Sequence, residues 1–323
     1  CEIYGKAEFL NPGGSVKDRV ALQIVREALA SGQLRPGPGA LITEGTAGST
    51  GVSLALVAAA TGCAAFVALP DDAAAEKAAT LAALGAEVVR VRPVSITHPG
   101  HHVNVARRRA DEAAASGRPA LFADQFENTA NFRAHLATGR EVWEQTCGAV
   151  DAFVSGAGTG GTIAGVSAAL KERNPAVRVF LVDPPGSGLY NKVTRGVMYT
   201  REEAEGKRLR NPFDTITEGI GINRLTANFN LACIDGAFKG TDREAVEMAA
   251  YLLRNDGLFL GSSAAMNCVG AVKVARALGP GHTIVTVLCD GGARHLSKFH
   301  NPEYLAGLGL TPTSQGAGLG FVS

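Results

Sequence analysis

Residues 152–173 read AFVSGAGTGGTIAGVSAALKER, and this stretch decides the fold class. Its first four residues have the apolar, β-branched and aromatic character of a short buried strand. A glycine-rich turn follows at 156–161, and residues 162–173 have the composition of a helix. A strand that passes through glycines directly into a helix is the repeating unit of sheets whose strands run parallel. The stretch therefore predicts an α/β protein.

The same unit recurs along the chain. Further strands are expected at residues 40–43, 64–69, 87–91, 120–123, 178–182 and 283–288. Further helices are expected at 16–30, 51–60, 73–84, 102–115, 128–145, 242–254 and 264–278. This alternation predicts two domains, each a twisted, mostly parallel sheet flanked by helices, with ligands at the carboxyl ends of the strands.

Length and composition agree with this organisation and limit the partners. A chain of 323 residues has room for about two domains, and 46% hydrophobic with 19% charged residues is typical of a folded protein. Lys plus Arg number 31 and Asp plus Glu 30, so the net charge of +1 gives no electrostatic footprint for nucleic acid. No apolar run approaches the roughly 18 residues of a membrane span. We expect a small-molecule ligand, with neither nucleic acid nor membrane as partner.

The cysteines and the first residues bear on the compartment. The six cysteines are scattered without metal-like spacing, which favours a reducing compartment, and we expect the cytoplasm. The opening residues 1–4, CEIY, resemble the interior of a strand, so we expect the native N-terminus to lie upstream. Import into an organelle therefore stays open.

Residues 11–19, NPGGSVKDR, form the first segment with chemical potential. Ser15 and Asp18 have the spacing of a capping box, so we expect Ser15 to be the N-cap of a helix with Lys17 in its first turn. A cation at a helix N-terminus is electrostatically unfavourable, and the same field lowers the pKa of an amine and favours a Schiff base with an aldehyde. On this segment alone, a surface lysine is the more ordinary interpretation.

Two glycine-rich turns could bind anions. Residues 44–51, EGTAGSTG, and 156–162, GAGTGGT, each follow a strand and open a helix, where backbone N–H groups attract a carboxylate or phosphate. Residues 156–161 also match the G-x-G-x-x-G dinucleotide pattern, with Asp183 near the position of a ribose-binding acid. A dinucleotide-dependent oxidoreductase is therefore an alternative from another class.

Three weaker signals complete the set. Ser262, after an apolar run and before a helix, could cap that helix or donate to a ring nitrogen. Gln125 follows the strand expected at 120–123 and could meet an anion. The histidines of 98–102, HPGHH, have no carboxylate or thiolate close by in sequence, so we expect no metal site.

Taken together, these segments resemble the cysteine synthase and cystathionine β-synthase family of pyridoxal-phosphate enzymes. The likeness runs from about residue 2 to residue 298 in the family's order and is strongest to its cysteine synthase (O-acetylserine sulfhydrylase) members. It implies fold type II, the tryptophan-synthase-β-like fold, with pyridoxal 5'-phosphate in the cleft between two domains. The domains implied are 13–124 (smaller), 1–12 with 125–310 (larger), and a flexible tail at 311–323.

The resemblance also implies a role for each segment. Lys17 is the Schiff-base lysine and catalytic base, and Ser49 and Ser262 contact the cofactor ring. The phosphate loop consists of Gly158, Thr159, Gly160, Gly161 and Thr162. The residues implied for substrate binding are Thr46, Ala47, Gly48, Ser49, Thr50, Gln125 and Gly219, the last in the glycine-rich loop 218–221.

Two positions depart from the family pattern, which usually reads TSGNTG where this chain has TAGSTG. Ser49 replaces an asparagine expected to bond the cofactor's phenolic oxygen. Ala47 lacks a hydroxyl expected near the substrate carboxylate. These changes concern the choice of reaction rather than the fold.

The implied reaction is β-replacement, in which O-acetyl-L-serine loses its acetate to give an aminoacrylate and sulfide adds to form L-cysteine. Cysteine desulfhydrase, cystathionine β-synthase and serine or threonine dehydratase share the first half of this reaction and stay open as alternatives. A homodimer is usual in the family and is implied here as well.

Overall fold

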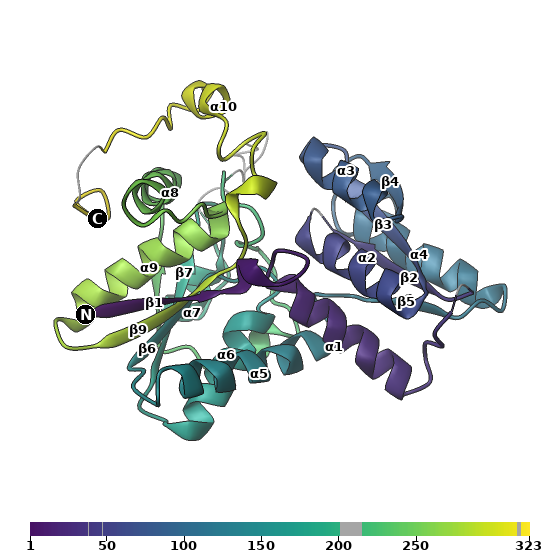
Figure 1. Ribbon diagram of the computed structural model, residues 1–323, viewed down its shortest axis with the longest axis horizontal. Coiled ribbons are helices and arrows are strands. Elements are labelled where there is room, and N and C mark those ends of the chain that lie inside the picture. Colours follow the sequence, from purple (N-terminus) through teal and green to yellow (C-terminus); the bar gives the residue numbers. More distant parts are fainter. Residues whose placement is uncertain (38, 47, 201–214, 315–317) are drawn as a thin grey trace. The chain divides into compact units, whose positions relative to one another are not determined.

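The computed structural model describes residues 1–37, 39–46, 48–200, 215–314 and 318–323 (Figure 1). The described residues divide into two compact units. The first unit comprises Cys1–Leu10 and His135–Ser323, and the second comprises Asn11–Ala134. The chain therefore leaves the first unit after a single strand and returns to it only after completing the second.

The second unit is built on a parallel sheet. Its described strands are β2 (Leu41–Gly45), β3 (Ala64–Pro70), β4 (Glu87–Val91) and β5 (Ala120–Phe122), in the order β4-β3-β2-β5. Its helices are α1 (Lys17–Ala30), α2 (Ser49–Thr61), α3 (Ala75–Ala83) and α4 (His102–Ala115). Ile42 packs in a cluster with α1 and α2, whereas its neighbour Leu41 packs in a cluster with α4. Successive side chains thus bury opposite faces of the sheet, as a sheet covered on both sides requires.

The first unit has a longer parallel sheet. Its described strands are β1 (Glu2–Ala7), β6 (Ala152–Ser155), β7 (Arg178–Asp183), β8 (Gly236–Lys239) and β9 (Thr283–Leu288), in the order β1-β9-β6-β7-β8. Its main helices are α6 (Gly161–Arg173), α7 (Leu189–Arg195), α8 (Asp242–Asp256), α9 (Ser262–Leu278) and α10 (Pro302–Gly307), and most of α5 (Ala130–Gln145) also belongs to it. In Figure 1, α8 and α9 lie on one side of the sheet and α5 and α6 on the other.

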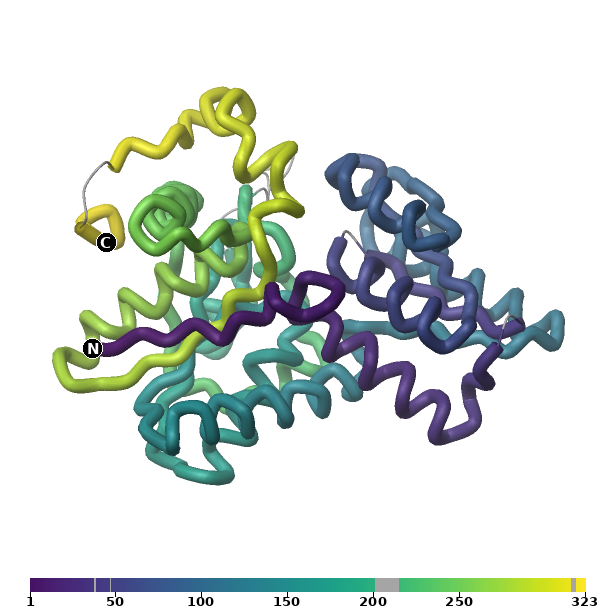
Figure 2. Tube along the Cα trace, in the orientation of Figure 1, coloured from purple at the N-terminus to yellow at the C-terminus, as the bar shows by residue number. Residues whose placement is uncertain are grey.

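The predicted α/β class with parallel sheets is confirmed. Every strand and helix expected from the pattern is present, with ends that differ by at most a few residues. Strand β8 was not expected, because GAFK is too short and too mixed to give a strand pattern, and the short helices α7 and α10 were not expected either. Figure 2 shows how β1, in purple, runs beside β9 near the other end of the sequence.

Strands β2 and β6 each lead directly into a glycine-containing loop and then into a helix, α2 and α6 respectively. In a parallel sheet these loops lie at the carboxyl ends of the strands, where ligands of such folds bind. The fold therefore presents both predicted anion-binding loops at the functional edge of their own sheets. Among the described residues, no helix is long and apolar enough to cross a bilayer.

The C-terminal segment packs on the first unit. Composition suggested a flexible tail at 311–323, yet Val322 is 2% exposed and belongs to the core cluster beside α8 and α9. The amide and the hydroxyl of Ser323 both donate to Glu244, at 2.9 and 3.1 Å. Thr313 and Ser314 contact Glu247 in the same way. The described part of this segment is thus tied to two carboxylates on α8.

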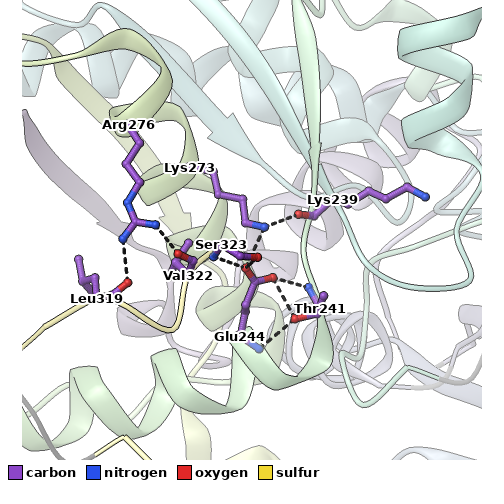
Figure 3. Close-up of polar contacts among 8 residues, drawn as sticks. All are labelled: Lys239, Thr241, Glu244, Lys273, Arg276, Leu319, Val322 and Ser323. Carbon is purple, nitrogen blue, oxygen red and sulfur yellow. Dashed lines mark hydrogen bonds and ion pairs between the residues drawn. The ribbon is translucent and has the colours of Figure 1, made fainter.

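Glu244 is the centre of this attachment (Figure 3). It is buried, and Lys273 on α9 lies 2.8 Å from its carboxylate. Burial alone would raise the pKa of Glu244, but hydrogen bonds from Lys273, Ser323 and Thr241 outweigh it and lower the pKa. A carboxyl with a lowered pKa stabilises the fold above its unfolded pKa and loses this contribution as the pH falls.

We expect Glu244→Gln to lower the free energy of unfolding by about 2 kcal/mol at pH 7, because it leaves Lys273 without its carboxylate. The difference from the wild type should be smaller at about pH 4, because the stabilising contribution of the carboxylate begins to be lost as the pH falls below its ordinary pKa of 4.5. Urea denaturation at both pH values measures it. Glu303→Gln, at an exposed position of α10, is the control and should change the value by less than about 0.5 kcal/mol. Equal stability of Glu244→Gln and wild type at pH 7 would contradict the prediction.

Candidate active site

Lys17 is the first residue of α1 and is half-buried. Its backbone N–H donates to the Ser15 hydroxyl at 3.3 Å, and Val16, which already has helical backbone angles, occupies the N-cap position. The prediction that Ser15 is the N-cap is therefore wrong by one residue. The placement of Lys17 in the first turn of the helix is as expected.

Asp18 explains why Ser15 does not form the predicted capping box. Its carboxylate accepts hydrogen bonds from the Gly13 amide and from the Ser53 hydroxyl on α2, so it does not close a capping box with Ser15. These bonds connect the turn before α1 to the helix that follows the predicted carboxylate loop. The turn that bears the Lys17 amine is therefore connected by hydrogen bonds to α2 within the second unit.

The loop between β2 and α2 contains the residues predicted to bind a carboxylate. Thr46 is buried, and its hydroxyl accepts from the Gly48 amide at 3.3 Å. Gly48 precedes α2 without a side chain to cap it, and Ser49 is the first helical residue. Helix N-termini leave backbone N–H groups without intrahelical partners, which suits an anion. Ala47 lies outside the described residues.

The structure brings Thr50 and Gln125 together although they are separated by 75 positions in the sequence. The Thr50 hydroxyl donates to the side-chain oxygen of Gln125 at 2.6 Å, and both residues are buried. Two residues that the sequence assigned separately to carboxylate binding thus form one contact. Because Thr50 occupies the oxygen of the Gln125 amide, it also fixes the orientation of that amide.

Glu44 also contacts Gln125, and sequence analysis did not single it out. Its buried carboxylate accepts from the backbone N–H of Gly45 at 3.0 Å and from the backbone N–H of Gln125 at 3.2 Å. Burial raises the pKa of Glu44 to about 8, and the nearby charge of Asp124 contributes. The sequence held one signal for Glu44: it is an acidic residue within LITEG, the strand β2, whose residues are all buried.

The loop predicted to hold a phosphate, 158–162, lies between β6 and α6, which begins at Gly161. A Cβ atom added to Gly158 would lie 2.2 Å from the carbonyl oxygen of Gly219. The amide of Gly221 donates to the carbonyl of Ala157 at 2.8 Å. The two glycine-rich loops of the first unit therefore touch backbone to backbone, which only glycine at 158 permits.

Three buried polar residues position this loop, and sequence reasoning missed all of them. The Thr226 hydroxyl donates to the carbonyl of Thr159 at 2.7 Å, and Asn267 accepts from the amide of Gly156 at 2.7 Å. The imidazole of His135 lies 3.2 Å from the Thr162 hydroxyl and is fully buried. Periodicity could show that positions 135 and 267 face inward, but it carries no information on which loop they would meet.

Ser262 is the first residue of α9 and has no exposed surface. Its hydroxyl oxygen accepts from the backbone N–H of Glu218 at 2.9 Å. A hydroxyl has one hydrogen and two lone pairs, so a serine that accepts in this way still has its hydrogen to donate. The arrangement suits donation to a basic ring nitrogen.

The sequence suggested Asp183 as a ribose-binding acid, but its carboxylate binds the protein's own backbone. Its carboxylate accepts from the amide of Tyr190 in the first turn of α7 at 2.7 Å, and burial raises its pKa to about 6. It therefore satisfies a helix N-terminus of its own protein. In the part of the chain that the structure describes, no three His, Cys, Asp or Glu side chains gather as a metal site would require.

Comparison with known proteins identifies the family. Residues 1–290 match the family model described as pyridoxal-phosphate dependent enzyme. The chain belongs to this family. Cysteine synthase 2 of Schizosaccharomyces pombe is 52% identical over 320 residues, which cover 97% of this chain and 80% of that protein. Cysteine synthase of Dictyostelium discoideum is 49% identical over 306 residues, covering 94% of this chain and 79% of that protein.

A solved structure agrees with the fold. The crystal structure of the O-acetylserine dependent cystathionine β-synthase from Helicobacter pylori has a TM-score of 0.76 and 32% sequence identity, covering 92% of this chain and 89% of that one. The predicted fold type II is thereby confirmed.

The described residues fit the pyridoxal-phosphate of this family. The helix N-terminus at Gly161, reached through glycines and flanked by the Thr159 and Thr162 hydroxyls, offers donors for a phosphate. The buried hydroxyl of Ser262 retains a hydrogen for a ring nitrogen. Lys17 supplies a primary amine at the start of α1.

We expect the raised pKa of Glu44 to appear in stability measurements. Because its folded pKa of about 8 exceeds its ordinary value of 4.5, the folded state binds the proton more tightly, and stability declines as the pH rises between these values. Relative to Glu44→Gln, the wild type should lose up to about 1.4 kcal/mol of unfolding free energy per pH unit from pH 5 to 8.

Urea denaturation across this pH range measures the difference. Glu112→Gln, at an exposed position of α4, serves as control and should run parallel to the wild type. A constant difference between Glu44→Gln and wild type from pH 5 to 8 would contradict the assignment.

Proposed function

We propose that this protein forms L-cysteine from O-acetyl-L-serine and sulfide by β-replacement. The observation that carries the proposal is the identity of about half of all residues, over nearly the whole chain, to proteins named cysteine synthase. The amine at the start of α1 and the glycine-rich loop before α6 supply the two attachments that the family's cofactor needs. The solved relative from Helicobacter pylori is also named for dependence on O-acetylserine.

Four parts of the chain would hold the cofactor. Lys17 would bind it covalently through its amine, and the loop 158–162 would bind its phosphate. Ser262 would donate to the ring nitrogen, and Ser49 lies where the family has an asparagine beside the cofactor oxygen. The bound cofactor supplies an electron sink for the substrate's α-carbon.

The substrate carboxylate is bound by the N-terminus of α2. Thr46, Gly48, Ser49 and Thr50 offer backbone and hydroxyl donors there, and Ala47, which lies outside the described residues, belongs to the same proposed set. Gln125, oriented by Thr50, closes on the same carboxylate. Gly219 leaves room for the substrate beside the 218–221 loop.

Two side chains determine the course of the reaction. The Nζ atom of Lys17 would act as the base that removes the proton from the substrate's α-carbon. Ser262 is neutral and would not hold a proton on the ring nitrogen as an aspartate would. The cofactor would then withdraw electrons more weakly, which favours loss of a β-substituent, and its replacement by sulfide, over transamination.

We also propose a homodimer in a reducing compartment, the cytoplasm or the interior of an organelle. None of the six cysteines, all among the described residues, forms a disulfide bond, which fits a reducing environment. Ile3 and Tyr4 on the edge strand β1 and Leu10 beyond it expose large apolar side chains that a second copy would cover.

Light scattering coupled to size exclusion tests the dimer, and a monomeric mass would contradict it.

We expect Lys17→Ala to lose the visible absorbance of covalently held cofactor and to lower kcat at least about 10³-fold, because it removes both the attachment and the base. Borohydride reduction of the wild type, followed by peptide mapping, should place the cofactor tag on Lys17. Lys192→Ala, on α7, is the control and should retain both properties. A tag on another lysine would overturn the assignment.

Thr50→Val keeps the side-chain shape but removes the donor that orients Gln125. We expect KM for O-acetyl-L-serine to rise about tenfold while the KM for sulfide is unchanged, since a lost hydrogen bond of about 1.4 kcal/mol affects only carboxylate binding. Thr61→Val, at the other end of α2, is the matched control because its hydroxyl bonds only within the helix. An unchanged KM in Thr50→Val would remove Thr50 from the substrate site.

A further inference from the structure

An imidazole between two carboxylates lies close to Ser262 and takes no part in the function proposed above. His295 is 4% exposed, and its Nε2 atom lies 3.0 Å from the carboxylate of Asp290. Its Nδ1 atom lies 3.5 Å from the carboxylate of Glu218. We propose that His295 is a positioning residue that fixes the direction in which Ser262 donates its hydrogen. The inference rests on the proposed function.

On one side, the segment of Asp290 holds the residues just before Ser262. The backbone N–H of Gly261 donates to the carbonyl of Asp290 at 3.0 Å. Gly291 forms an isolated bridge with Leu260, and the amide of Gly292 donates to Phe259 at 3.0 Å. The turn that begins α9 is therefore clamped along its length by residues 290–292.

The imidazole and the Asp290 carboxylate also pack directly on this turn. A Cβ atom at Gly261 would lie 2.0 Å from a carboxylate oxygen of Asp290 and 2.7 Å from Nε2 of His295. No other residue fits at position 261 while the contact between His295 and Asp290 persists. The position of Ser262 thus depends on where these two side chains lie.

On the other side, Glu218 holds the hydroxyl of Ser262 itself. Its backbone N–H donates to the Ser262 oxygen at 2.9 Å and occupies one lone pair. The direction of the remaining hydrogen depends on where this amide lies. His295 contacts the side chain of the same residue, so it joins the two segments that define the surroundings of Ser262.

The chemistry of the ring suits this role. The two ring nitrogens point in different directions, so a single imidazole faces both carboxylates, Asp290 through Nε2 and Glu218 through Nδ1. Glutamine in its place can donate from a single nitrogen and cannot span both partners. His295→Gln is therefore expected to release one of the two segments while keeping a polar side chain of similar size.

The test combines His295→Gln with Ser262→Ala in a double-mutant cycle on the cofactor-loaded protein. In the wild-type background, His295→Gln should shift the visible absorbance and the fluorescence of the bound cofactor and lower kcat about tenfold. KM for sulfide should stay within about twofold. In the Ser262→Ala background, His295→Gln should add less than about twofold to the loss of kcat and no further spectral shift. His282→Gln, a half-buried histidine bonded to Gly279, is the control and should match the wild type.

Equal losses from His295→Gln in both backgrounds, or an unchanged cofactor spectrum, would overturn the inference, because a merely structural role does not depend on Ser262. If His295→Gln fails to fold, Glu218→Gln is tested instead. The Glu218 side chain is 28% exposed, and this variant changes only one of the two carboxylates that face His295. The same dependence on Ser262 is expected of it, and its absence counts against the proposal. A wild type that binds no pyridoxal-phosphate and makes no cysteine would overturn the proposed function and this inference together. If the wild type is fully active and the variants have the same kcat and cofactor spectrum, only this inference is overturned.

Discussion

The first unit depends on one close approach of backbone to backbone. Where the loop after β6 meets the 218–221 loop, Gly158 lies so near the carbonyl of Gly219 that no side chain fits between them. The hydrogen bond from Gly221 to Ala157 maintains this approach. The N-terminus of α6 can receive an anion because the loop before it is held in this narrow path.

Buried polar side chains also position the candidate site residues in both units. Glu44 and Thr50 hold Gln125 in the second unit, and Asn267 and Thr226 hold the glycine loop in the first. Each makes a hydrogen bond in an environment where leaving the group without one costs about 1–3 kcal/mol. The geometry of the candidate site therefore depends on hydrogen bonds made within the protein by buried side chains.

The fold could be predicted because it is encoded locally. Alternating apolar runs, glycine turns and alanine-rich helical stretches predict most of the described strands and helices, whereas the brief strand β8 and the short helices α7 and α10 gave too little pattern. Segments such as residues 11–19 and 158–162 could be found for the same reason, since their chemistry lies in consecutive residues. Glu44, His135 and His295 could not, because their partners are distant in sequence and only the folded chain brings them together. Ser15 shows the same limit at short range, since Ser53 on another helix competes for Asp18.

The order of the strands has a consequence for how the protein is made. Among the described strands β1 leaves the ribosome before all others, whereas its partner β9 is the last of them to be synthesised. The second unit, by contrast, is one uninterrupted stretch of sequence from Asn11 to Ala134. During translation it can therefore complete its sheet while β1 still exposes an unpaired edge, and the nascent chain must keep that edge from other strands until β9 has emerged.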